Sequence, residues 1–179
     1  MSGRVLGVLV SALAIAACGS GSDSNEVNQA QVNEEEKIES DETVLDGVWV
    51  KECGPVEETE GDPLYDVVTL TFEGYDFKSD IKNFMDASCM TPLAVSPNPT
   101  SSGDLSIGDE IVAESGLLVH ELDTHITEYN GAEFDLYDYT IFRIEADKLY
   151  LGKDTGVNDG ESAETRHQAL NFERIYHKQ

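Results

Sequence analysis

Cationic residues are scarce in this 179-residue chain. It contains 11 lysines and arginines against 36 aspartates and glutamates, which gives a formal net charge of −25 at pH 7. A surface this acidic repels nucleic acid and anionic lipid headgroups, so we expect neither as a partner. Solubility in salty surroundings explains such a charge, and a basic partner protein or divalent cations are the more specific alternatives.

Long hydrophobic runs are also missing, except at the start of the chain. Residues 5–17 (VLGVLVSALAIAA) are all apolar or small, and Arg4 gives a short positive start before them. This length suits the apolar region of an export signal and is too short to span a bilayer as a stable helix. The sequence therefore predicts an exported protein.

The apolar run ends in a branched aliphatic residue, two small residues and a cysteine, Ile15-Ala16-Ala17-Cys18. This segment resembles the lipobox of bacterial lipoproteins, and an ordinary secretory signal cut by chance before a cysteine is the alternative. The resemblance implies cleavage before Cys18 and lipid attachment to its thiol. Because one acyl chain anchors only marginally, the two or three chains usual in such proteins would give a long-lived membrane anchor. Gly19, where Asp favours inner-membrane retention in enteric-type bacteria, points to the outer membrane of the cell envelope.

Composition divides the chain into three parts. We expect a signal peptide over residues 1–17, a flexible acidic tether over 18–43 and a folded domain over 44–179. The tether contains Glu34-Glu35-Glu36 and almost no large apolar residues, so it cannot bury enough surface to fold alone. Loss of Arg4 with the signal would take the net charge to −26.

Cysteines are few, and their number suggests which are acylated and which form a disulfide. If Cys18 is acylated, Cys53 and Cys89 remain as an even pair in an exported protein. Oxidising compartments favour a disulfide between them, and two free buried thiols are the alternative. In the chain-entropy model, closing this loop stabilises the fold by roughly 3 to 4 kcal/mol.

Long amphipathic helices are lacking, and short β-type runs fill the rest of the chain. Asn130-Gly131 is a strong hairpin signal, whereas residues 92–103, with three prolines, predict a loop. Strands in sequence order with tight turns pair with their neighbours, so we expect an all-β, up-and-down antiparallel barrel of about eight strands. A two-sheet sandwich is the structural alternative. The expected strands cover residues 47–51, 64–73, 76–86, 105–113, 117–127, 133–145, 148–152 and 170–177.

The segment Leu45-Asp46-Gly47-Val48-Trp49 resembles the Gly-x-Trp signature that opens the first strand of lipocalins. In that family the tryptophan closes one end of the barrel and packs under an arginine from near the final strand. The resemblance therefore implies a contact between Trp49 and Arg174, with a cation–π contribution of roughly 0.5 to 2 kcal/mol. Two further pieces are similar to small lipocalin-like bacterial lipoproteins: Trp49-x-x-x-Cys53 with residues 84–89 (FMDASC), and residues 147–152 (DKLYLG).

Motifs for catalysis, metals or cofactors are lacking. His120 and His125 lie five residues apart, whereas the histidines of HExxH are four apart, and an odd spacing on a strand sends them to opposite faces. The acidic loop Asp154–Glu164 fails the EF-hand pattern at its third, sixth and twelfth positions. There is no nucleophile elbow and no phosphate-cradling glycine loop. We therefore expect neither an enzyme nor a metal or cofactor site.

Three functions fit these features. The first is a membrane-tethered binding module whose barrel takes an apolar or amphipathic small ligand, suggested by Trp49 and the aromatic strand Phe134–Phe142. The second is an acidic interaction or inhibitor protein for a basic partner protein. The third is a structural part of the envelope without a ligand. Fold alone does not choose among them.

Overall fold

The computed structural model describes residues 42–56, 64–94 and 98–179. The expected signal peptide, the lipid-attachment residue Cys18 and most of the tether lie outside the described residues. Those that are described belong to one compact unit, Glu39–Gln179.

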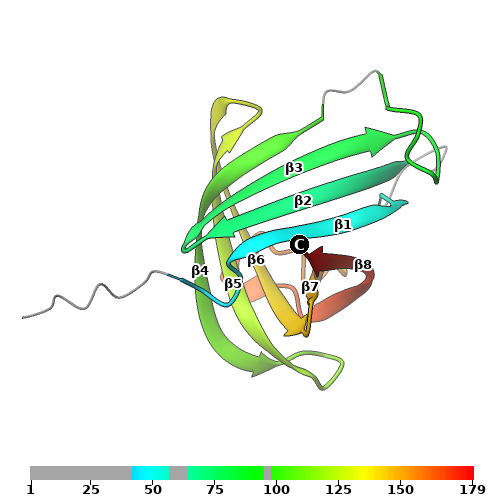
Figure 1. The fold of residues 1–179 in the computed structure, drawn as a ribbon. Helices are drawn as coiled ribbons and strands as arrows, with labels where there is room; N and C mark the ends of the chain where they lie inside the picture. Colours follow the sequence, from blue (N-terminus) through cyan, green and yellow to red (C-terminus); the bar gives the residue numbers. More distant parts are fainter. Residues whose placement is uncertain (1–41, 57–63, 95–97) are drawn as a thin grey trace, which may run out of the picture. The chain divides into compact units, whose positions relative to one another are not determined.

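Within the described residues, eight strands run in sequence order around a closed antiparallel ring, each paired with its neighbours and β8 paired with β1 (Figure 1). The expected up-and-down barrel is thereby confirmed, and the sandwich alternative is wrong. One short 3-10 helix, Ala163–Thr165, precedes the last strand. The strands are β1 (Gly47–Pro55), β2 (Tyr65–Glu73), β3 (Asp76–Phe84), β4 (Thr100–Val112), β5 (Leu118–Tyr129), β6 (Ala132–Glu145), β7 (Lys148–Lys153) and β8 (Ala169–Lys178).

The largest difference from the sequence expectation lies at the start of β4. This strand begins at Thr100, inside the segment expected to be a loop, and Ser101 and Ser102 pair with both β3 and β5. The prolines all precede the strand, so they remove no ladder hydrogen bond. Polar small residues are tolerated here because the closed ring pairs their backbone on both sides.

Alternating positions along the strands build an apolar core at one end of the ring. We call this end, where β1 begins and β8 ends, the Trp49 end, and the opposite end, which carries the β5–β6 turn, the Asn130 end. The Trp49 indole is 1% exposed, and its Nε1–H donates a hydrogen bond to the Leu45 carbonyl oxygen at 2.6 Å. The buried residues packed around it are Leu45, Val68, Leu70, Phe72, Leu105, Leu122, Phe142, Leu149 and Tyr176.

A second apolar cluster lies on the outer face of the ring. Ile141 is fully buried although its neighbour Phe142 points into the barrel, so both faces of β6 are covered here. Ala113 and Leu117 from the β4–β5 turn cover the outer face, and the adjacent Glu114 N–H donates to the Gln168 carbonyl at 2.9 Å. This turn thus fastens the chain just before β8.

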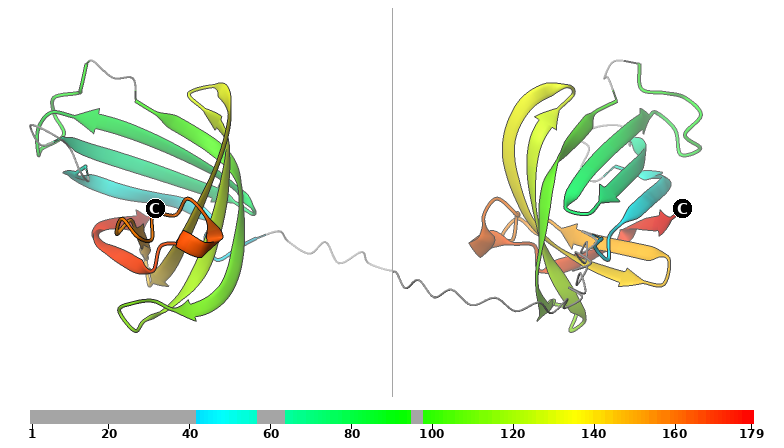
Figure 2. Two further views of the ribbon diagram at one scale, coloured as in Figure 1. Left: turned by 180° about the vertical axis from the view of Figure 1, so that it is seen from behind. Right: turned by 60° about the vertical axis from the view of Figure 1, so that its left-hand side comes forward.

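The loop between β7 and β8 completes the ring where β7 is too short to do so. The Tyr139 N–H donates to the Gly160 carbonyl at 2.9 Å, and the His167 N–H donates to the Tyr139 carbonyl at 3.1 Å. The loop therefore occupies the position beside β6 that a longer β7 would have taken. From Tyr139 to the β5–β6 turn, β5 is the sheet partner of β6 within the described residues, and this part of β6 has a free outer edge (Figure 2).

Replacing Gly103 with alanine should destabilise the barrel, because β4 passes close to β5 at this residue. A Cβ atom there would lie 1.9 Å from the His125 carbonyl oxygen, so backbone must shift. We expect Gly103→Ala to lower the free energy of unfolding by about 2 kcal/mol or more in urea titrations. The exposed Ser106→Ala on the same strand is the control, expected to change it by less than about 0.5 kcal/mol. Equal effects of both variants would contradict this account of the strand contact.

Candidate ligand-binding site

The cation that lies over Trp49 is Lys178 and not the expected Arg174. Lys178 Nζ lies 5.1 Å from the centre of the indole ring, in the position that the lipocalin resemblance assigned to Arg174. The reason is register: Trp49 is directly opposite Lys178 in the β1–β8 ladder, whereas Arg174 lies four residues nearer the Asn130 end. Arg174 takes part in a different interaction inside the barrel.

Two cations share one carboxylate inside the ring. Lys51 Nζ pairs with Asp66 Oδ1, and Arg174 Nη2 lies 3.1 Å from Asp66 Oδ2. The side chains of Lys51 and Asp66 are each 4% exposed, and that of Arg174 is 18% exposed. A lysine and an aspartate this deeply buried are rare unless paired. The three groups together carry two positive charges and one negative charge.

The guanidinium of Arg174 stays charged in this setting. Burial lowers its pKa, but Tyr176 and Asp66 outweigh burial, so its pKa lies above the usual value. The β8 backbone that presents Arg174 is fixed by Asn171, whose Oδ1 accepts the Glu173 and Arg174 N–H groups at 3.0 and 3.1 Å. Arg174 is therefore a charged group whose backbone is fixed in the interior.

A second polar group lies on the β6 wall of the interior. His167 is buried, and its Nδ1 lies 2.9 Å from Thr140 Oγ1, while its Nε2 has no hydrogen-bond partner within the part of the chain that the structure describes. Burial raises the pKa of Asp138, although His167 and Arg166 oppose this shift. Both side chains crowd Gly160: a Cβ there would lie 2.8 Å from Asp138 Oδ1 and 2.9 Å from His167 Nε2. Glycine is required at this position for that reason and for its φ of +77°.

Apolar side chains on the inward faces are less completely buried toward the Asn130 end. Ile81 of β3 and Ile126 of β5 are partly buried, whereas Leu136 of β6 is 47% exposed. Leu136 lies directly opposite Ile126 in the ladder and shares its face. The interior thus changes from a sealed apolar core to a mixed region. Charged groups lie on β1, β2 and β8, apolar groups lie on β3, β5 and β6, and the β6 wall also carries Asp138 and Thr140.

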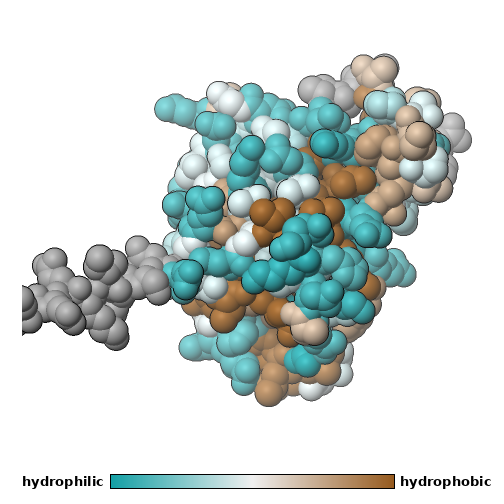
Figure 3. Space-filling view, viewed as in Figure 1, coloured by the Kyte–Doolittle hydropathy of each residue, from teal (hydrophilic) through white to brown (hydrophobic). Residues whose placement is uncertain are grey.

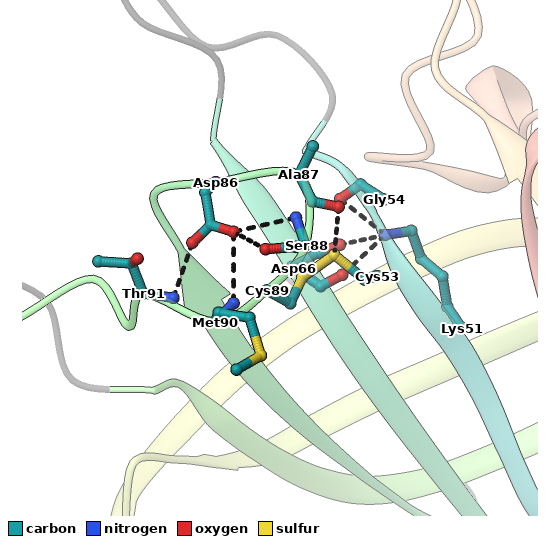
Figure 4. Close-up of a disulfide and its surroundings, with 10 residues drawn as sticks. All are labelled: Lys51, Cys53, Gly54, Asp66, Asp86, Ala87, Ser88, Cys89, Met90 and Thr91. Carbon is teal, nitrogen blue, oxygen red and sulfur yellow. Dashed lines mark hydrogen bonds and ion pairs between the residues drawn. A yellow bond between two sulfur atoms is a disulfide. The ribbon is translucent and has the colours of Figure 1, made fainter.

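The expected disulfide between Cys53 and Cys89 is confirmed, and it ties the end of β1 to the turn after β3 (Figure 4). Asp86 organises this turn by accepting backbone N–H groups from Ser88 and Thr91 at 3.0 and 2.7 Å. Hydrogen bonds from Ser88 and then Thr91 hold the pKa of Asp86 far below its ordinary value. The turn lies beside the Lys51–Asp66 pair at the Asn130 end.

The two histidines of β5 lie on opposite faces, as their odd spacing predicted. His120 stacks on Phe142 with ring centres 5.5 Å apart, whereas His125 stacks on Tyr137 at 4.2 Å on the outer face. In the acidic loop Asp154–Glu164, two carboxylates stabilise local turns of the backbone. Asp154 accepts the N–H of Gly156, and Asp159 accepts the N–H of Glu161. Among the described residues, no group of three or more His, Cys, Asp or Glu side chains is placed to hold a metal ion.

The buried charges of Lys51 and Asp66 were not predicted, although the sequence contains a signal for them. Lys51 follows Trp49 by two residues, and Asp66 precedes Val68, Leu70 and Phe72 in strict alternation. Strand periodicity therefore places both charged side chains on the core face. No comparable signal exists for His167, because it lies outside any strand.

Comparison with known proteins finds no matching protein-family model, and no curated protein matches the chain. No helix among the described residues is long and apolar enough to cross a membrane.

Removing the disulfide should destabilise the domain without changing its topology. The double variant Cys53→Ser/Cys89→Ser releases a constraint between residues 36 apart in the sequence. We expect the free energy of unfolding to fall by about 3 to 4 kcal/mol in urea titrations, because the unfolded chain gains entropy. The control is Met90→Ala, which changes an exposed side chain in the same turn. A double variant as stable as that control would contradict a structural role for the bond.

Neutralising Asp138 should stabilise the domain at neutral pH. Its folded-state pKa is raised above the ordinary 3.8, so the neutral acid favours folding and this benefit is lost as the pH rises through the raised pKa. We expect Asp138→Asn to raise the urea midpoint at pH 7 and to have little effect at or below about pH 3.8. A variant less stable than the wild type at pH 7 would show that the partners of Asp138 outweigh its burial. The exposed Asp109→Asn is the control for net charge.

Proposed function

We propose that this chain is a lipid-anchored protein of the cell envelope whose barrel binds an amphipathic small molecule with an anionic end. In this proposal Cys18 is the acylated first residue of the exported form, the acidic tether separates the barrel from the outer membrane, and the protein carries out no chemistry on its ligand.

The observation that carries the proposal is the change in character along the inside of the ring. At the Trp49 end the inward side chains are apolar and sealed from solvent. Toward the Asn130 end they include a charged cluster on one wall, and on the other wall two partly buried isoleucines and the 47% exposed Leu136. Small-molecule sites combine an apolar lining with a few well-placed polar groups in this way.

Charge indicates which end of a ligand the cluster prefers. The chain as a whole has a net charge of −25, yet the cluster of Lys51, Asp66 and Arg174 contains two cations and one carboxylate. Arg174 is the most exposed of the three, and a guanidinium binds carboxylates and phosphates well because its N–H groups form a planar fork. We therefore expect an anionic headgroup at Arg174.

The rim at the Asn130 end offers apolar surface for the rest of such a ligand. Met90 is 78% exposed and Met85 is also exposed, both in the turn after β3 that the disulfide holds. Figure 3 shows apolar side chains gathered on this projecting turn, whereas much of the same face is hydrophilic. Methionine adapts its shape readily, which suits a surface that a flexible chain must pass.

Arg174→Gln should remove the preference for an anionic ligand. The probes are dodecanoate and dodecanol, which share a chain length and differ in charge. We expect the wild type to bind dodecanoate more tightly and the variant to lose about tenfold to a hundredfold of that affinity, since a hydrogen bond to a charged group contributes roughly 1.5 to 3 kcal/mol. Dodecanol affinity should hardly change. Isothermal titration calorimetry measures all four combinations.

Lys178→Gln is the matched control, because it removes the same charge at the opposite end of the ring. It should leave both affinities within about twofold of the wild type. If neither probe binds the wild type, the proposed ligand site is wrong. If both variants weaken dodecanoate equally, the effect comes from net charge and the headgroup assignment is wrong.

A further inference from the structure

The first half of β6 has an unpaired edge. Residues 132–137 are all exposed, and on the side away from β5 the described chain supplies its first backbone partners only at Tyr139. An antiparallel strand directs its backbone N–H and C=O groups to alternate sides every residue, so Tyr137 presents its groups to the same side as Tyr139. Figure 2 shows this part of β6 standing beyond the loop that flanks the rest of the strand.

Such an edge can pair with another strand, and its side chains indicate what kind of strand would pair there. Phe134 and Leu136 are 44% and 47% exposed on the inward face, while Tyr137 is 49% exposed on the outer face. Tyr137 is held by stacking on His125, whose Nε2 lies 2.9 Å from Asp135 Oδ1. The aromatic–acidic row on the outer face is therefore held in place before anything binds, and an apolar row lies on the other face.

Charge decides which kind of strand can pair with this edge, a second copy of the chain or a basic segment. Pairing with a second copy of the chain along this edge would bring Glu133 and Asp135 close to their counterparts, in a molecule of net charge −25. Like charges opposite one another destabilise strand pairing, and edge charges are a common protection against self-association. A basic strand would meet the same carboxylates with favourable electrostatics.

We propose that the free edge of β6, residues 133–137, binds an extended basic segment of a partner protein by strand addition. The segment alternates apolar and cationic residues. Its apolar side chains pack beside Phe134 and Leu136, and its Lys or Arg side chains lie beside Asp135 and over the Tyr137 ring. Backbone hydrogen bonds to Tyr137 supply affinity, and the alternation supplies specificity. This surface is distinct from the proposed ligand site in the barrel.

The test uses the full-length chain and two capped peptides, Lys-Val-Lys-Val-Lys-Val-Lys and Glu-Val-Glu-Val-Glu-Val-Glu. We expect the basic peptide to bind at least tenfold more tightly, to weaken in 0.5 M NaCl, and to protect the Tyr137 amide from hydrogen exchange. Equal binding of the two peptides, or an unprotected Tyr137 amide in the basic complex, would overturn the proposal.

Two substitutions at one position separate backbone from side-chain contributions. Tyr137→Ala keeps the edge N–H, whereas Tyr137→Pro removes it, and proline is tolerated where the N–H faces away from the sheet. We expect Tyr137→Pro to weaken the basic peptide at least tenfold relative to Tyr137→Ala. Equal affinities would overturn strand addition. Asp135→Lys, which leaves the backbone intact, should weaken the basic peptide and strengthen the acidic one; no change in that preference would equally overturn the proposal.

Discussion

The backbone hydrogen bonds that Tyr139 makes with Gly160 and His167 decide most of what is particular to this barrel. β7 has 6 residues and β6 has 14, so the ring could not close along the full length of β6 with strands alone. The β7–β8 loop fills the gap at Tyr139 and stops there. This one junction closes the wall, brings His167 beside Thr140, and leaves the rest of β6 with a free edge.

The same junction is fastened on both faces of the sheet. Outside, Arg166 pairs with Glu121 and Asp123, and its guanidinium lies 5.6 Å from the centre of the Tyr139 ring. Inside, the adjacent His167 is held against β6. Two consecutive residues of the loop, Arg166 and His167, thus contact opposite faces of the sheet. These contacts explain why an irregular loop can take the place of a strand beside β6.

Most of the fold could be predicted from the sequence, because hairpin turns and period-two patterns are local. Asn130-Gly131 and the run of β-type segments gave the eight strands in order, and the even cysteine pair gave the disulfide. Local signals could not place the β7–β8 loop against β6, since its bonds to Tyr139 depend on the unequal lengths of two strands. To predict which cation lies above Trp49, one would need the register between β1 and β8. These strands come from the two ends of the domain, so no local pattern in the sequence indicates their register. The burial of Lys51 and Asp66, by contrast, could have been predicted from the alternation of inward and outward residues along their strands.

We propose that the Asn130 half of the ring interior receives an amphipathic molecule with its anionic end at Arg174. Intermolecular nuclear Overhauser effects between ¹³C-labelled dodecanoate and the methyl groups of the protein test it most directly. We expect contacts from the alkyl chain to Ile81, Ile126 and Leu136, and a change in the Arg174 side-chain resonances. Contacts confined to exposed methyls at the Trp49 end, such as those of Val112 and Leu118, would contradict it.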